Sequence, residues 1–388
     1  MLSPSLPLFP KSFLPVLTAC LLAAAGWLIA APSALAGGGK LDAALDKVID
    51  DPLGPPGLSV IVQRGDRIDF RRRGVADRKT GAKPRIDSPM RIASMAKAFN
   101  GAVVLSLVSK GKLGLDDTIG QWLPGVWPLA DDITVRQLLA HTGGMPDYIR
   151  QPAFIDQLIS DPGQYMTPLQ LMSYVNTKAP GLPPGEDYEY SDSDNVMAGL
   201  IAEAASGKSY NQLLRSEVYR PVGISDTSLP DTLAMPKGYM HGYDRNDDGK
   251  FEDQSKFINP ALAWASGGIV STPEDVNAFF RAYVGGDLFS AKVRRSQNDF
   301  VRGTSSPPGP GRNDATLSMF RYKTRCGTVY GHTGSYPGYR LFAASSANGR
   351  RSVVFSVNSQ IVPGSGSPRV SGLIRQAQAD AVCLALRK

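Results

Sequence analysis

The chain has 388 residues, a length that suits one large domain or two ordinary ones. Its 42% hydrophobic and 20% charged residues are typical of a globular protein and exclude a disordered or fibrous chain. The formal net charge of +7 is spread along the chain without a block of like charges, so the composition gives no support for nucleic-acid binding.

The N-terminal segment 1–36 has the layout of a secretory signal peptide. Lys11 is its only charged side chain, a mostly apolar run covers 13–31, and an Ala-Leu-Ala cleavage site ends at Ala36. Two alternatives stay open. The residues up to Cys20 resemble a lipoprotein cleavage box, and the apolar run is long enough to remain as an uncleaved membrane anchor. We expect a protein that is secreted after cleavage.

The first predicted elements of the mature chain are a hairpin and a helix. Residues 57–74 alternate apolar and polar side chains around a Gly65-Asp66 turn, which predicts two paired strands. A helix is expected from near Ser94 to a stop at Gly111.

The middle of the chain is predicted to be mostly helical, because residues that cap helices recur there. The predicted helix starts are Thr134 with Gln137, Thr167 with Gln170, Ser209 with Gln212, and Thr272 with Asp275. Gly207 is expected to end the helix that runs through Ala205. Residues 244–249 begin like a calcium-binding loop, but Ser255 stands where a bidentate glutamate is required. We therefore expect an acidic hairpin turn and no metal site.

Strands are predicted again after about residue 315. Segments 339–345 and 352–358 flank Asn348-Gly349, a strong hairpin signal, and a final helix is expected over 371–386. Strands at both ends with helices between them predict an α/β domain built from residues 37–115 and 262–388. A mainly helical domain over 116–261 would be inserted in it, with the active site in the cleft between them.

Cys326 and Cys383 are the cysteines that follow the N-terminal segment. Two cysteines in an oxidising compartment are expected to form a disulfide, which would tie the last helix to the C-terminal sheet. Two buried free thiols are the alternative.

A candidate nucleophile lies at the predicted helix start near residue 94. Ser94-Met95-Ala96-Lys97 places a serine and a lysine on one helix face, so the amine can reach the hydroxyl. No G-x-S-x-G motif occurs, which argues against an α/β-hydrolase. The same serine–lysine spacing at 109–112 is interpreted as a solvated helix end, so the motif by itself is weak.

Two further motifs follow Ser94 in the chain. They are Tyr190-Ser191-Asp192 and His332-Thr333-Gly334, and each alone is compatible with a surface tyrosine or a turn histidine. Together the three motifs resemble the signature of the serine D-alanyl-D-alanine carboxypeptidases and class C β-lactamases. Longer segments are also similar, among them "ITVRQLLAHTGGMPDY" and "CGTVYGHTGSYPGYRLFAASSANGRRS", and the resemblance covers about 57–385.

The resemblance implies a fold, a disulfide and a set of site residues. The fold would be α/β and β-lactamase/D,D-peptidase-like, an antiparallel sheet flanked by helices plus an inserted all-helical domain. In the related carboxypeptidases a cysteine before the histidine motif pairs with one near the C-terminus, which matches Cys326 and Cys383. No metal or organic cofactor is implied.

The implied roles are those of acyl-enzyme chemistry. Ser94 would attack a carbonyl carbon, and Lys97, with a pKa lowered by its cleft, could accept the proton. Tyr190 would relay a proton to the leaving group and later activate water; the sequence does not decide which of the two is the acylation base. The remaining implied contacts are the backbone N–H groups of Ser94 and Ser335 as an oxyanion hole, His332 as an orienting group, and Thr333 at the substrate carboxylate. Gly334 would be a further oxyanion or substrate-binding residue.

Two departures from the family pattern concern the substrate. Asp192 stands where asparagine is usual, and an ionised aspartate cannot donate to a substrate carbonyl, so Asp192 must be protonated, paired with a cation, or matched to a different substrate. The arginine that would hold a substrate carboxylate is replaced by Phe320. Arg321, one residue on, is the remaining candidate for this substrate-binding role, although a one-residue shift turns a side chain to the other face of a strand. The triplet Ser193-Asp194-Asn195 imitates another family motif and is interpreted as a coincidence.

The expected function is that of an exported serine hydrolase, foremost a D-alanyl-D-alanine carboxypeptidase acting on peptidoglycan stem peptides. An esterase or a β-lactamase on the same fold, and a binding protein without catalysis, are the alternatives. The partners would be a small peptide or ester substrate and β-lactams as acylating inhibitors. No nucleic acid is expected, and the protein would be a monomer.

Overall fold

The computed structural model describes residues 39–364 and 367–387. The predicted signal peptide lies outside these described residues. Within the described part of the chain, no helix is long and apolar enough to cross a membrane.

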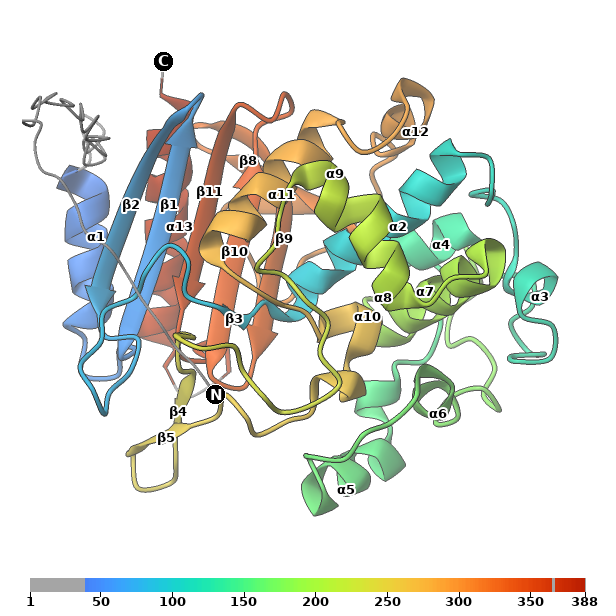
Figure 1. Ribbon diagram of the computed structural model, residues 1–388, viewed down its shortest axis with the longest axis horizontal. Coiled ribbons are helices and arrows are strands. Elements are labelled where there is room, and N and C mark those ends of the chain that lie inside the picture. Colours follow the sequence, from blue (N-terminus) through green and yellow to red (C-terminus); the bar gives the residue numbers. More distant parts are fainter. Residues whose placement is uncertain (1–38, 365–366, 388) are drawn as a thin grey trace, which may run out of the picture.

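A seven-stranded antiparallel sheet joins the two ends of the chain (Figure 1). Its strand order is β2-β1-β11-β10-β9-β8-β7, so the predicted N-terminal hairpin pairs with the predicted C-terminal strands. The strands are β1 (Gly57–Arg64), β2 (Arg67–Gly74), β7 (Arg312–Thr316), β8 (Met319–Thr324), β9 (Gly327–Tyr336), β10 (Tyr339–Ser345) and β11 (Arg351–Val357). Both predicted hairpins and the α/β class are confirmed.

Helices cover both faces of this sheet. Val60 and Val62 of β1 pack in the core beneath α1 (Gly39–Ile49) and α13 (Pro368–Leu386). Ile61 between them points to the opposite core, which includes α11 (Pro273–Gly285). This alternation follows from the period of two in a strand, and it explains why β1 is apolar at successive positions. The predicted final helix is confirmed, but it begins at Pro368 and not at residue 371.

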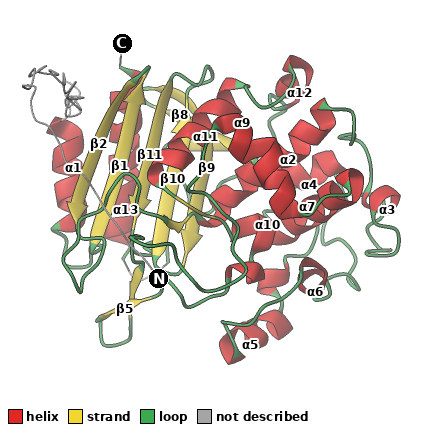
Figure 2. Cartoon of the chain, in the orientation of Figure 1, coloured by secondary structure: helices red, strands yellow, loops and turns green. Residues whose placement is uncertain are grey.

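The remaining helices gather beside the sheet, as the red elements of Figure 2 show. They are α2 (Ala96–Ser109), α3 (Ile119–Trp122), α4 (Val135–Ala140), α5 (Pro152–Ser160), α6 (Pro168–Met172), α7 (Asp192–Ser206), α8 (Tyr210–Leu213), α9 (Arg220–Val222), α10 (Trp264–Gly267) and α12 (Ala291–Ser296). Shorter turns are the 3₁₀ segments η1 (Ala93–Met95), η2 (Tyr148–Arg150) and η4 (Pro260–Leu262) and the π-helical η3 (Leu214–Tyr219).

The predicted caps are found where the sequence places them. Thr134, Thr167 and Ser209 each form a capping box with the glutamine three residues later. Thr272 caps α11, and Gly207 ends α7 in a left-handed conformation with φ of 67°.

Two smaller sheets complete the fold. The strands β3 (Met90–Arg91) and β6 (Val270–Ser271) pair beside the start of α2. The strands β4 (Tyr243–Arg245) and β5 (Phe251–Asp253) pair as a hairpin, so the acidic segment 244–249 forms the end of β4 and the turn, as expected. Asp244 accepts hydrogen bonds from the backbone N–H groups of Gly338 and Gln360, so this carboxylate fastens the hairpin to the main sheet.

Cys326 and Cys383 form a disulfide that joins the β8–β9 turn to α13, as expected. The predicted division into two domains stays a prediction. One continuous hydrophobic core contains Ile61 of the sheet as well as Leu138 of α4 and Ile201 of α7, so the two predicted parts are closely packed together.

Candidate active site

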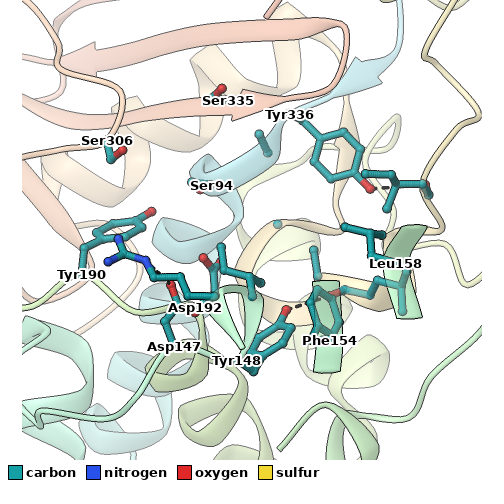
Figure 3. A pocket seen from close by; sticks show the side chains of 17 residues that line it. Ser94, Asp147, Tyr148, Phe154, Leu158, Tyr190, Asp192, Ser306, Ser335 and Tyr336 are labelled. Carbon is teal, nitrogen blue, oxygen red and sulfur yellow. Dashed lines mark hydrogen bonds and ion pairs between the residues drawn. The ribbon is translucent and has the colours of Figure 1, made fainter. Parts of the chain in front are cut away.

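The candidate nucleophile lies at a strained turn. Ser94 is the middle residue of η1, which leads directly into α2. Ala93 before it has a φ of 51°, a left-handed conformation that non-glycine residues rarely adopt and that clusters at functional sites. Ser94 lines a pocket of about 360 Å³ together with Tyr190, Asp192 and Ser335 (Figure 3).

Gly334 allows strand β9 to approach this turn. A Cβ atom at Gly334 would lie 2.6 Å from the carbonyl oxygen of Ile92 and 3.1 Å from the Cβ of Ala93. Because only glycine fits this contact, Ser335 on the same strand can face Ser94 across the pocket mouth. Gly334 does not line the pocket itself, so its part is to permit the close approach.

Lys97 is fully buried behind Ser94, one helical turn further along α2. Its Nζ lies 3.3 Å from Ser94 Oγ, 2.6 Å from Asp192 Oδ1 and 3.0 Å from the carbonyl oxygen of Ser266. Burial lowers the pKa of Lys97, but the negative charge of Asp192, the proximity of Tyr190 and the hydrogen bond to Asp192 outweigh it and raise this pKa above its ordinary value. The expectation of a lowered pKa is therefore wrong, because the sequence does not show that Asp192 contacts Lys97.

Asp192 begins α7, and its carboxylate is paired with a cation, one of the three arrangements expected for this departure from the family pattern. Tyr190 lies two residues before it, with its ring centre 4.9 Å from Lys97 Nζ. The Tyr190 hydroxyl oxygen is buried and has no hydrogen-bond partner among the described residues. Burial raises the pKa of Tyr190, while the charge of Lys97 and the Ser94 hydroxyl act in the opposite direction.

A buried histidine–aspartate pair packs against the ring of Tyr190. The His141 ring lies 4.6 Å from the Tyr190 ring, centre to centre, and His141 Nδ1 is 2.8 Å from Asp194 Oδ2. The backbone N–H of Ser191 also points at Nδ1, at 3.3 Å. Burial lowers the pKa of His141 and raises that of Asp194 well beyond their usual values, which agrees with a neutral pair.

The Ser193-Asp194-Asn195 triplet does not line the pocket. Ser193 accepts from the Tyr148 N–H, Asp194 contacts His141, and Asn195 accepts a hydrogen bond from Asn100. Tyr190, by contrast, faces Ser94 across the pocket, which favours the interpretation of the triplet as a coincidence.

The histidine motif lies on β9, and its members point in different directions. His332 is buried with its ring centre 6.4 Å from that of Tyr190, and its Nδ1–H donates to the Thr333 carbonyl oxygen at 2.5 Å. Burial lowers the pKa of His332 to about 3, so the imidazole is neutral. The Thr333 hydroxyl donates to the Pro307 carbonyl oxygen and does not line the pocket, which corrects its expected place at a substrate carboxylate.

Arg321 also lies outside the pocket. Its guanidinium pairs with Asp314 at 2.6 Å and stacks over Phe300 at 3.7 Å. Phe320, its neighbour on β8, instead packs against the His332 ring, with 5.0 Å between ring centres. Adjacent residues of a strand point to opposite faces, and this alternation is the physical reason for the correction.

Several pocket residues were missed by the sequence analysis. Asp147, which is 7% exposed, accepts the Asp192 backbone N–H through Oδ1 at 3.1 Å and lies 3.6 Å from Arg150 Nε through Oδ2. Burial and the nearby charge of Asp192 raise the pKa of Asp147 to about 7. The apolar wall of the pocket includes Tyr148, Ile149, Phe154, Leu158, Ile258, Leu262 and Tyr336. Asp147 and Tyr148 lie in the family-like segment "ITVRQLLAHTGGMPDY", but no spacing rule connects this segment to Ser94.

Known proteins resemble this chain over most of its length. A solved D-stereospecific amidohydrolase from Streptomyces sp. has a TM-score of 0.75 and 26% identity, over 88% of this chain and 98% of that one. The putative penicillin-binding protein PbpX of Bacillus subtilis is 27% identical over 79% of this chain and 72% of its own length. The D-alanyl-D-alanine-carboxypeptidase/endopeptidase AmpH of Escherichia coli is 26% identical over 61% and 59%, respectively.

The family comparison covers the same region. The model of the family described as Beta-lactamase matches residues 45–371, which include Ser94, Tyr190 and His332. This range extends from α1 into α13 and contains every strand of the main sheet. The chain therefore belongs to the beta-lactamase family of serine hydrolases.

Proposed function

We propose that the protein hydrolyses esters or amides of small apolar acyl groups through an acyl-enzyme on Ser94. The observation that carries this proposal is the composition of the pocket beside Ser94. One wall is apolar, and neither of the two groups expected to hold a substrate carboxylate, Arg321 and Thr333, lines the pocket. An apolar acyl group would be desolvated against Phe154 and Leu158, and its carbonyl would then lie at Ser94 (Figure 3).

The proposed roles follow from the positions of the side chains. Ser94 Oγ attacks the carbonyl carbon, and the backbone N–H groups of Ser94 and Ser335 stabilise the oxyanion. Tyr190 exchanges protons with Ser94 and the leaving group, and His332 orients the site as a neutral imidazole. A water activated at Tyr190 then hydrolyses the ester bond to Ser94.

A second candidate is the D-alanyl-D-alanine carboxypeptidase activity on peptidoglycan stem peptides. One observation favours it: Arg150 lines the pocket and is 66% exposed at its side chain, so it could hold a terminal carboxylate in place of Arg321. The similarity to AmpH points in the same direction. In this case β-lactams would be acylating inhibitors, and the enzyme would be exported, a proposal that the disulfide supports.

A substrate panel separates the two candidates. We expect turnover of p-nitrophenyl butyrate and of apolar amino-acid amides, and no release of D-alanine from a D-Ala-D-Ala peptide. Phe154→Ala should lower kcat/KM about tenfold for a bulky acyl group and leave an acetyl ester almost unchanged. Release of D-alanine that is impaired in Arg150→Ala, while the ester rate is unchanged, would establish the carboxypeptidase instead.

A further inference from the structure

Lys97 has a complete set of hydrogen-bond acceptors. An ammonium has three N–H donors, and Lys97 Nζ has three acceptors: Asp192 Oδ1, the Ser266 carbonyl oxygen and Ser94 Oγ. A carbonyl and a carboxylate can only accept, so two of the three protons are fixed by their partners. The third position faces Ser94 Oγ, where an ammonium donates a proton and a neutral amine would turn its lone pair. Lys97 therefore donates to the nucleophile in its ammonium form.

Asp192 stabilises the ammonium form of Lys97. A fully buried ammonium is costly without a counter-ion, and Asp192 supplies one at 2.6 Å. Asp192 is also the first residue of the 15-residue helix α7, whose N-terminal dipole favours a negative charge there. Its own backbone N–H donates to Asp147, so the carboxylate is fixed in position. An asparagine at this position would give Lys97 a hydrogen bond without the charge.

We propose, on the basis of the proposed Ser94 acyl-enzyme, that Asp192 is a positioning residue that keeps Lys97 as an ammonium throughout the reaction and thereby assigns proton transfer to Tyr190. The Tyr190 hydroxyl is the buried polar atom at Ser94 that has no hydrogen-bond partner among the described residues. This hydroxyl interacts with both Ser94 and Lys97, so it is placed to take a proton from Ser94.

The step balances without any change in charge on Lys97. Ser94 Oγ bonds to the carbonyl carbon while its proton moves to Tyr190 Oη. Tyr190 gives its own hydroxyl proton to the leaving nitrogen or oxygen, and the bond from the carbonyl carbon to that atom breaks. Tyr190 begins and ends as a neutral phenol, which agrees with the raised pKa that burial gives it. The charge of Lys97 stabilises the negative charge that develops on the oxygens during the transfer.

The pH profile of an Asp192 variant tests this assignment. In wild type we expect no loss of kcat/KM for p-nitrophenyl butyrate from Lys97 titration between about pH 6 and 9.5, because the Asp192 charge raises the pKa of Lys97. In Asp192→Asn the burial penalty is no longer offset, so the Lys97 pKa falls. A descending alkaline limb should appear, approaching about tenfold per pH unit.

Other titratable groups near Lys97 do not obscure the comparison of the two pH profiles. Burial keeps the pKa values of His141 and His332 below the tested range and raises the pKa of Asp194 well above its ordinary value. Asp147, with a pKa of about 7, contributes a limb near neutrality in both proteins. The matched control Asp116→Asn removes an exposed carboxylate that pairs with Arg136 outside the pocket, and it should keep the wild-type profile.

Failure of the role assigned to Asp192 can be distinguished from failure of the proposed acyl-enzyme. If rapid-quench mass spectrometry of the wild type finds no acyl group on Ser94, the proposed function fails. If Ser94 is acylated but Asp192→Asn keeps a profile parallel to wild type, the assignment to Asp192 is overturned. If Asp192→Asn does not fold, the protonation of Lys97 can be followed in wild type by the pH dependence of its side-chain ¹⁵N resonance. The spectrum of Lys97→Met assigns this resonance. An ammonium that persists to about pH 9.5 supports the inference, and deprotonation below about pH 9 overturns it.

Discussion

The chemistry at the residue scale depends on contacts between segments that are far apart in the chain. Ser94, Lys97 and Tyr190 could be predicted as a group from motif spacing and family resemblance. The state of Lys97 could not, because its charge partner Asp192 is 95 residues away and the sequence does not show the 2.6 Å contact. The same holds for Asp147, whose contact with the Asp192 backbone joins residues 45 positions apart.

The role of Tyr190 as proton donor to the leaving group can be tested with Tyr190→Phe. If Tyr190 donates a proton to the leaving group, Tyr190→Phe should affect substrates with basic leaving groups most. We expect a loss of about 10²–10⁴-fold for a 4-nitroanilide amide and a smaller loss for the matching p-nitrophenyl ester, whose leaving group needs no proton. Steady-state kinetics on the matched pair measures the ratio. Equal losses on both substrates would show that Tyr190 is not the donor.

Helix starts could be predicted where residues close together in the chain determine them. Capping boxes at Thr134, Thr167 and Ser209 were read from the sequence because a cap involves residues three positions apart. The equivalent box at Thr118, which begins α3, was missed because this helix has only four residues and shows no periodicity. The strained φ of Ala93 was also missed, since it is imposed by the surrounding elements.

The close contact between β9 and η1 is expected to be necessary for activity, because it holds Ser335 near Ser94. A side chain in Gly334→Ala would press on the Ile92 carbonyl at 2.6 Å and separate Ser335 from Ser94. We expect kcat/KM to fall by about 10²-fold, as for a displacement of reacting groups by about 1 Å. Gly372→Ala in α13 is the control, because its Cβ would meet no atom within 4 Å. Wild-type activity in Gly334→Ala would contradict the proposed oxyanion contact.

The disulfide gives a second prediction at this scale. It closes a loop with a sequence separation of 57, so its removal in the double variant Cys326→Ser/Cys383→Ser should cost about 4 kcal/mol of unfolding free energy. Urea unfolding followed by circular dichroism measures this change. Both cysteines lie outside the pocket, so kcat should stay at the wild-type value under native conditions. An unchanged midpoint would show that the cross-link does not constrain the unfolded chain.

The whole molecule has the architecture that the order of the elements predicts. Strands near both ends of the chain indicated one sheet made from the two termini, and β1 indeed pairs with β11. The strand order within the sheet was not predicted from patterning, because nearly continuous apolar strands match one another in many registers. Monomeric state, export and the division into two domains stay predictions.

Covalent labelling of Ser94 would show whether the protein forms the proposed acyl-enzyme. The purified protein would be mixed with p-nitrophenyl butyrate, quenched in acid during the first turnover, and mapped by peptide mass spectrometry beside Ser94→Ala. We expect one butyryl group on the peptide that carries Ser94, and loss of both adduct and turnover in the variant. Turnover that persists in Ser94→Ala, or a butyryl group on another residue, would contradict this expectation.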